Sequence, residues 1–457
     1  MHARATRRDF LRLLSIGASA ALVGAPAFDA IAATGAENET EYFVFLIALG
    51  GWDVTLWADP RNEARGLIHP ASTENTDTAP LKRWVDAPLA DGAFKAFTIV
   101  RPRGSNLVFG PGIGDLADFA DRLTVINGLE MNTVAHPDGQ VFSTTGRHPE
   151  GGTRVASSSI DTMLSNEFGR EQLLPTVSVR FPSSCVGEGF DPRVVPLAID
   201  DIGSIGRTLA RSQLYDSDAE RDRVTALLSE EARDLAKRSL YTGAADDLGL
   251  QYDALRRMLG AHLQDVFSAA GLRKARPEFD YKARFAGAPA VNAAFAIEAM
   301  KRNLVRSVAF AVGGFDTHAN NYRGHALLQQ ETFGLVADTL RALDATPHPL
   351  LDGHKLSEHT HILVVSDFCR TPQINLGMGR DHYPNNSALV VSPRFRANFV
   401  FGKTDPEQLL PLATRRFAGG ERPIAPPDLL ATFLAAFRVD PRKYMRDGEV
   451  VPELLKS

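Results

Sequence analysis

Two short polar clusters carry the side chains of this sequence that are best suited to chemistry. The first, GGFDTH, contains Asp316 and His318, and the second begins at Ser366 and reads SDFCRTPQINLGMGRDH. Each follows an apolar run, residues 307–312 and 362–365, with the length and composition of a buried strand. Ligands bind at the carboxyl ends of the strands in a parallel α/β sheet, so both clusters are expected at one functional edge.

Carboxylates and imidazoles are ligands for divalent ions such as zinc or manganese. A third apolar run, YFVFLIAL at residues 42–49, leads into Gly-Gly-Trp-Asp and adds another carboxylate after a strand. For any one of these residues, a helix cap or turn is the alternative role. Together they predict a centre of one or two ions, with Asp53, Asp316, His318, Asp367, Asp381 and His382 as ligands.

The segment 132–146 holds candidate catalytic groups. The hydroxyls of Ser143 and Thr144 are candidate nucleophiles, and His136 is a candidate base or metal ligand. Helix capping and packing are the alternative for these residues. Without a side-chain nucleophile, a hydroxide formed on the metal would attack instead. Arg380 is a candidate anion clamp, because its planar fork matches the oxygens of phosphate or sulfate.

Other polar residues are interpreted more plainly. The only two cysteines, Cys185 and Cys369, exclude a disulfide scaffold. They leave open either one bridge in an oxidising compartment or a buried thiol beside the site. His354, His359 and His361 stand in the polar segment DGHKLSEHTH and are expected to be solvated.

The first 32 residues predict export from a bacterial cell. They contain the twin-arginine core TRRDFLR, a short Ala/Gly-rich apolar stretch and an Ala-Ile-Ala cleavage pattern. The expected partner is therefore the twin-arginine translocase, and the expected location is the periplasm or the medium. The apolar stretch is shorter than the roughly 20 residues that span a bilayer, so no stable membrane insertion is expected. A formal net charge of −5 gives no indication of nucleic-acid binding.

The order of elements predicts one α/β domain over residues 41–457. Strands are expected early and late in the chain, and a charged helical block interrupts them at about 205–285. Within that block, amphipathic helices are expected at 218–238 and 248–270. Further helices are expected to cover the sheet at 290–303, 324–344 and 427–437.

The motifs GGWD, GGFDTH and SDFCRTPQINLGMGRDH, behind a twin-arginine signal, resemble the bacterial family called domain of unknown function 1501. That family is similar to the alkaline phosphatase and sulfatase superfamily. The resemblance implies an alkaline-phosphatase-like α/β/α sandwich with a mostly parallel central sheet and a helical insertion. By position, it also implies that Asp53, Asp316, His318, Asp367 and His382 hold two metals.

The sequence departs from the superfamily pattern where an attacking Ser is expected, because Asp138 or Gly139 stands there. It also lacks the Cys/Ser-x-Pro-x-Arg signal of a formylglycine sulfatase. The resemblance implies a metal-dependent hydrolase of a small-molecule or polymer ester of phosphate or sulfate. The alternative is a non-catalytic or degenerate member that binds an envelope or extracellular partner.

Overall fold

The computed structural model describes residues 40–61, 99–152, 154–187, 189–204, 217–238, 268–319, 321–377 and 379–456. The predicted signal peptide lies outside these residues, and so does nearly all of the helix predicted at 248–270. No helix within these described segments is both long enough and apolar enough to cross a membrane.

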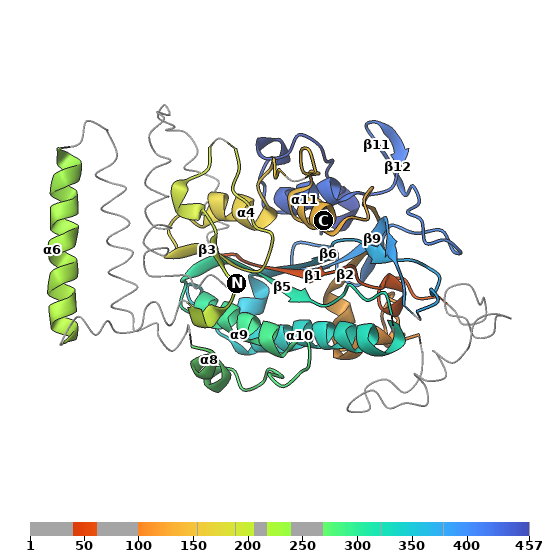
Figure 1. Ribbon diagram of the computed structural model, residues 1–457, viewed down its shortest axis with the longest axis horizontal. Helices are drawn as coiled ribbons and strands as arrows, with labels where there is room; N and C mark the ends of the chain where they lie inside the picture. Colours follow the sequence, from red (N-terminus) through yellow and green to blue (C-terminus); the bar gives the residue numbers. More distant parts are fainter. Residues whose placement is uncertain are drawn as a thin grey trace.

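An eight-stranded sheet forms the centre of the molecule (Figure 1). Its order is β10-β2-β9-β6-β1-β5-β3-β4, and only β9 runs antiparallel to its neighbours, which confirms the mostly parallel sheet. The strands are β1 (Tyr42–Leu49), β2 (Leu123–Glu130), β3 (Leu174–Val179), β4 (Leu197–Ile199), β5 (Val305–Gly313), β6 (Thr360–Ser366), β9 (Asn385–Val391) and β10 (Phe399–Phe401).

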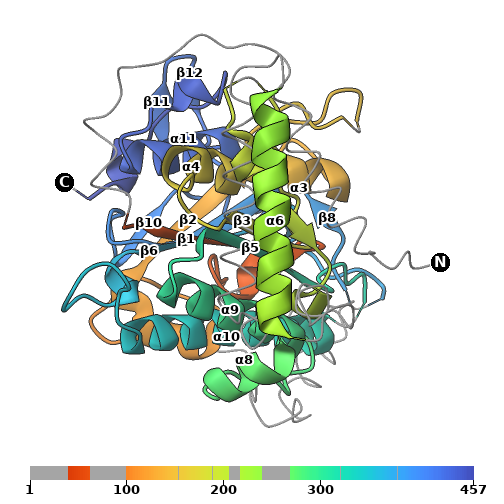
Figure 2. The same ribbon diagram turned by 90° about the vertical axis from the view of Figure 1, so that its left-hand side faces the viewer.

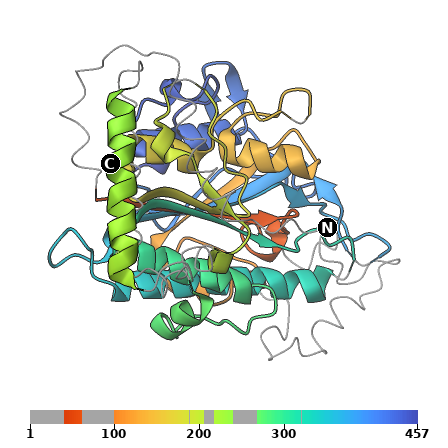
Figure 3. The ribbon, with the colours of Figure 1, turned by 60° about the vertical axis from the view of Figure 1, so that its left-hand side comes forward.

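Helices cover both faces of the sheet, which confirms the α/β/α sandwich (Figures 1 and 3). Tyr42, Val44 and Leu46 share one core with α9 (Gly287–Lys301) and α10 (Ala326–Ala345). The alternate β1 residues Phe43, Phe45 and Ile47 share the other core with α4 (Ile160–Phe168) and α11 (Pro426–Ala436). A strand that is covered on both faces has apolar residues at nearly every position, so its sequence is one apolar run. This is why the sequence predicted β1.

The described part of the helical block contains α6 (Asp218–Lys237) and α8 (Ala269–Ala275). In Figure 1, α6 lies apart from the two helical layers, on the side of the sheet where β3 is labelled. The limits predicted for an insertion at about 205–285 stay a prediction.

The topology brings the predicted site residues to one edge. Strands β1, β5 and β6 are parallel neighbours, so the segments that follow Leu49, Gly313 and Ser366 leave the sheet side by side. The hairpin β7 (Cys369–Arg370) and β8 (His382–Tyr383) adds the end of the second polar cluster. Helix α3 (His136–Thr145) lies beside β8 at this edge (Figure 2).

Candidate metal centre

Three imidazoles and one carboxylate converge at the carboxyl ends of β5 and β6. The Nε2 atoms of His136, His318 and His382 lie 3.3, 3.0 and 3.1 Å from Oδ1 of Asp316. The Nε2 atoms of His318 and His382 are 3.1 Å apart. The structure therefore brings together Asp316, His318 and His382, and adds His136 to them.

The second ring nitrogen of each imidazole, Nδ1, contacts an oxygen that fixes the orientation of the ring. Nδ1 of His136 contacts Oδ2 of Asp367 at 2.8 Å, and Nδ1 of His318 contacts Oδ1 of Asp381 at 2.6 Å. Nδ1 of His382 lies 2.8 Å from the carbonyl oxygen of Val134. All three partners are acceptors, so each Nδ1 carries the hydrogen and donates it. The Nε2 atom of each ring then faces Asp316, the arrangement typical of histidines that ligate metals.

The ligand atoms of His136, Asp316 and His382 lie within 4.8 Å of one another, a spacing that suits a metal ion. Ligands at 2.0–2.1 Å in a tetrahedron lie about 3.3 Å from one another, and the contacts of Asp316 with the three imidazoles and of His318 with His382 are 3.0 to 3.3 Å long. Nε2 of His136 is buried and has no hydrogen-bond partner. Lone pairs at these distances repel unless a cation or protons lie between them, so this donor set fits a divalent ion.

Protonation of the cluster follows from its charges. Although burial alone would raise the pKa of Asp316, the hydrogen bond from Arg370 and the contact with His382 hold it well below its ordinary value. The hydrogen bond to Asp367 raises the pKa of His136, against the effect of burial. The hydrogen bond from His318 lowers the pKa of Asp381. Asp316 is thus an anion at neutral pH, and a metal ion would compete with a proton on His136.

The start of α3 places His136 in the cluster. The helix begins at His136 with a proline in its first turn, which suits a position whose backbone N–H has no helical partner. Gly139 lets the first turn approach the end of β6, because a Cβ there would lie 2.3 Å from the carbonyl oxygen of Asp367. That close approach brings Nδ1 of His136 to the carboxylate of Asp367.

Replacing Gly139 by alanine should destabilise the protein by about 1–3 kcal/mol, because the added methyl group must push α3 away from β6. Alanine normally favours a helix interior by about 0.5–1 kcal/mol over glycine. The matched control is Gly334→Ala in α10, where a Cβ would meet nothing within 4 Å. Urea unfolding should show G334A slightly more stable than wild type. Equal stabilisation by both substitutions would refute the role given to Gly139.

Asp367 supports the cluster from behind. Its side chain is fully buried, and Oδ2 is 2.8 Å from Nδ1 of His136. The same oxygen accepts hydrogen bonds of 3.1 Å from the backbone N–H of Gly50 and from the side chain of Gln140. These contacts of Oδ2 orient His136, whereas Oδ1 of Asp367 is buried without a hydrogen-bond partner among the described residues.

Arg370, which the sequence motifs did not single out, ties the loops of the site together. It is fully buried, and its guanidinium donates to the carbonyls of Gly51 at 2.8 Å, Phe315 at 2.9 Å and Arg380 at 3.1 Å. Nη2 also donates to Oδ1 of Asp316 at 2.8 Å. It thus joins the ends of β1 and β5 to the segment before β8. The only sequence signal was its place inside the second polar cluster.

Asp53 and Arg380 form a buried pair next to the site. Nε of Arg380 lies 2.9 Å from Oδ2 of Asp53, and both side chains are buried. Oδ1 of Asp53 accepts from the backbone N–H and hydroxyl of Thr55, and Oδ2 accepts from Asn321 at 2.7 Å. Asp53 thus caps a short 3-10 helix, the alternative weighed for it above. These contacts favour neither Asp53 as a ligand nor Arg380 as an anion clamp.

The hydroxyls predicted as nucleophiles bond to backbone carbonyls. Ser143 donates to Ser366 at 2.7 Å, and Thr144 donates to Gln140 at 2.9 Å within the helix. Both side chains are buried. This arrangement corresponds to the packing role left open for them and does not favour attack on a substrate. Cys185 and Cys369 are both free thiols.

His325 lies under the site as a buried neutral base. Its Nε2 accepts from the backbone N–H of Asp53 at 2.9 Å, and its Nδ1 is 2.6 Å from the hydroxyl of Thr317. Burial lowers the pKa of His325 to about 3.

The lowered pKa of His325 predicts that the folded protein loses stability in acid. The unfolded chain takes up the proton near pH ~6.5, whereas the folded protein resists it down to about pH 3. The contribution of neutral His325 to the free energy of unfolding is therefore complete above pH ~6.5. It falls by about 1.4 kcal/mol per pH unit as the pH drops from ~6.5 towards 3. Urea unfolding across the window should show a shallower fall for His325→Gln than for wild type. An unchanged slope would contradict this assignment.

The histidines of the DGHKLSEHTH segment lie at the opposite edge of the sheet, with His354 and His359 before β6 and His361 at its start. The expectation that all are solvated is wrong for His361, which is fully buried between Glu41 and Ser392. His359 keeps only 16% of its side chain exposed, and His354 keeps 48%.

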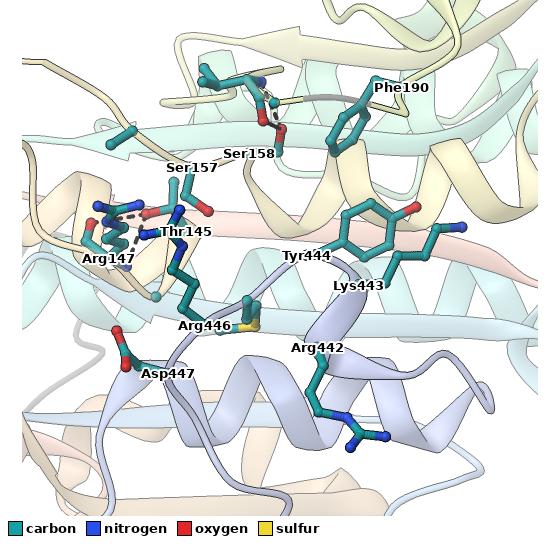
Figure 4. Close-up of a pocket in the computed structure, with 15 residues that line it drawn as sticks. Thr145, Arg147, Ser157, Ser158, Phe190, Arg442, Lys443, Tyr444, Arg446 and Asp447 are labelled. Carbon is teal, nitrogen blue, oxygen red and sulfur yellow. Dashed lines mark hydrogen bonds between the residues drawn. The ribbon is translucent and has the colours of Figure 1, made fainter. Parts of the chain in front are cut away.

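A cavity of about 290 Å³ lies at the other end of α3, lined among others by Thr145, Ser158 and Tyr444 (Figure 4). Three cations around it are paired with carboxylates: Arg147 with Glu150, Arg442 with Asp440 and Lys443 with Glu167. None of its lining residues belongs to the histidine cluster. We therefore assign the chemistry to the cluster and not to this cavity.

The chain matches one protein family along most of its length and resembles a solved structure weakly. No curated protein matches this chain. One similar solved structure comes from work on the metabolism of multiple glycosaminoglycans by Bacteroides thetaiotaomicron and bears the label 4S-sulf. It is 10% identical, with a TM-score of 0.33 over 91% of this chain and 76% of that one, a likeness too weak to inform the chemistry here. Residues 43–450, by contrast, match one family throughout, and the chain belongs to the family described as "Protein of unknown function (DUF1501)".

Proposed function

We propose that this protein is an exported, metal-dependent hydrolase of phosphate or sulfate esters. The observation that carries the proposal is the convergence of three imidazole nitrogens on one carboxylate oxygen. A single cationic partner is enough for a structural ion pair, whereas a metal ion gathers several imidazoles that acceptors orient from their other ring nitrogens.

The donor set favours a single ion, zinc or manganese, held by His136, Asp316 and His382, with His318 beside Asp316 as the fourth candidate ligand. Asp381 and Asp367 would orient two of these ligands from behind. Such an ion supplies a Lewis acid and lowers the pKa of a bound water towards ~7.

The exposure of the cluster suits a substrate that arrives from solvent. Half of the Asp316 side chain and 47% of the His318 side chain are exposed, whereas His136 and His382 are about one quarter exposed. Arg370 lies behind Asp316 and balances its charge. With a divalent ion bound, the ion and Arg370 together balance the carboxylates of Asp316, Asp367 and Asp381, so an anionic ester would meet no net negative charge at this centre.

The second candidate is a non-catalytic protein that keeps the metal for structure and binds an envelope or extracellular partner. The engagement of Ser143, Thr144 and Arg380 in buried contacts favours it, because these were the expected nucleophiles and clamp. Export by the twin-arginine translocase to the periplasm or medium is part of both proposals and rests on the sequence of residues 1–32.

A chelation experiment tests the proposal. Untagged protein loaded with zinc or manganese should hydrolyse an aryl phosphate or an aryl sulfate, lose that activity with chelator and regain it when the ion is restored. Chelator should also lower the melting temperature, because an ion bound only by the folded state stabilises it by RT ln(1 + [L]/Kd). Metal-dependent stability without turnover of either ester would support the second candidate. Absence of metal binding at the cluster would refute both.

A further inference from the structure

A second group of metal-ligating side chains lies at the opposite edge of the sheet. His354, Glu358 and His359 each offer one ligand atom, and these atoms lie within 4.8 Å of one another. Nδ1 of His354 is 3.0 Å from Oε2 of Glu358 and 3.2 Å from Nε2 of His359. These residues stand before β6, at the amino end of a strand whose carboxyl end leads to Asp367.

The backbone holds the three ligands in place. His359 accepts the backbone N–H of Tyr42 at 2.7 Å, which fastens it to the start of β1. His354 accepts the backbone N–H of His348 at 2.9 Å. Oε1 of Glu358 accepts the backbone N–H of Lys355 at 2.8 Å, which leaves Oε2 turned to His354.

A buried carboxylate supports the group as Asp367 supports the first centre. Nδ1 of His359 lies 3.4 Å from Oε1 of Glu41, a long contact that orients Nε2 towards His354. Glu41 is in turn held by His361 at 2.6 Å and by Arg394 at 3.2 Å. A carboxylate behind an imidazole fixes its tautomer and raises its basicity towards a metal.

We propose that His354, Glu358 and His359 form a second, independent zinc site. Two imidazoles and one carboxylate are a zinc donor set that leaves one position for water or for a ligand from a partner. Half of the Glu358 side chain is exposed, so an ion can reach the group from solvent. Bound zinc fastens the segment between α10 and β6 to the start of β1. The competing explanation is an ordinary ion pair between His354 and Glu358, which needs no metal.

Zinc stoichiometry of the untagged full-length protein, by equilibrium dialysis and elemental analysis, separates the two explanations. We expect two ions in wild type, one in His354→Ala, one in His382→Ala and none in the double variant. His148→Ala is the matched control, since His148 pairs with Asp138 outside both groups and should leave two ions bound. The conservative Glu358→Gln should weaken the second site about 10-fold or more.

A structural readout accompanies the stoichiometry. Zinc should slow amide hydrogen exchange in residues 346–359 of wild type and of His382→Ala, but not of His354→Ala. If His382→Ala does not fold, His318→Ala takes its place. Equal zinc content in wild type and His354→Ala, with no protection of this segment, would overturn the second site. Loss of the ion in His354→Ala together with an unchanged content in His382→Ala would instead support it and refute the first centre.

Discussion

Replacing His382 by alanine should remove the ion from the first centre and, with it, any ester hydrolysis. The substitution deletes one of four converging ligand atoms, and the neighbouring Nε2 of His318 and Oδ1 of Asp316, 3.1 Å from it, lose their shared partner. We expect metal affinity to fall by more than about 100-fold, beyond the 10–100-fold typical of a residue that only orients a ligand. Isothermal titration with zinc measures this loss.

Asp381→Asn provides the graded comparison. Its oxygen accepts from Nδ1 of His318 at 2.6 Å, so an amide that presents nitrogen there weakens the orientation without deleting a ligand. Affinity should fall by about 10–100-fold, and activity should be regained at high metal concentration. Secondary structure should persist in both variants, because both side chains are partly exposed. Unchanged affinity in His382→Ala would refute the first metal centre.

Replacing Arg370 by alanine should give the largest loss of stability, about 3–5 kcal/mol. The fully buried guanidinium donates to Gly51, Phe315, Arg380 and Asp316, and its removal leaves the carbonyls of Gly51 and Arg380 without this donor, whereas Phe315 still accepts from the backbone N–H of Thr317. Asp316 also loses the neighbouring cation, so its pKa should rise. A domain stable by only 5–15 kcal/mol loses much of its margin in this way.

Arg370→Lys keeps this prediction testable if the alanine variant fails to fold. Lysine retains the charge but not the planar fork, so it should satisfy Asp316 and leave some carbonyls unpaired. The free energy of unfolding of Arg370→Lys should therefore lie between those of wild type and Arg370→Ala. The matched control is Arg442→Ala, whose side chain is 88% exposed and pairs with Asp440, and which should leave the free energy of unfolding nearly unchanged. Similar stability of R370A and R442A in urea would contradict the role given to Arg370.

The strands of the sheet differ in how well the sequence predicts them. Strands β1, β5 and β6 are buried on both faces, so each reads as a continuous apolar run and was predicted within one or two residues. Strand β3 (LPTVSV) was missed, because its proline and serine break the apolar pattern although all six residues are buried. Strand β4 is only three residues long and partly exposed, too short to show a period.

The candidate site was predicted in part. The sequence placed Asp316, His318 and His382 at strand ends, and the structure brings them together. It also pointed to Asp367 and Asp381, which contact Nδ1 of His136 and Nδ1 of His318. The sequence pattern does not distinguish two roles for such a residue. An acidic residue that follows a strand can face the position of a metal ion or contact the histidine ring beside that position.

The sequence by itself therefore determined the family, the central strands β1, β5 and β6 and the edge at which polar residues gather, since apolar runs and short motifs are local properties of a chain. Tertiary structure alone decided which of those residues meet. His136 joins from α3 because Gly139 permits close contact with Asp367, 228 positions further along the chain. Arg380 is paired with Asp53, and Arg370 faces Asp316, although both arginines lie in one motif. Contacts of this kind depend on how buried charges find partners in three dimensions, which no local pattern encodes.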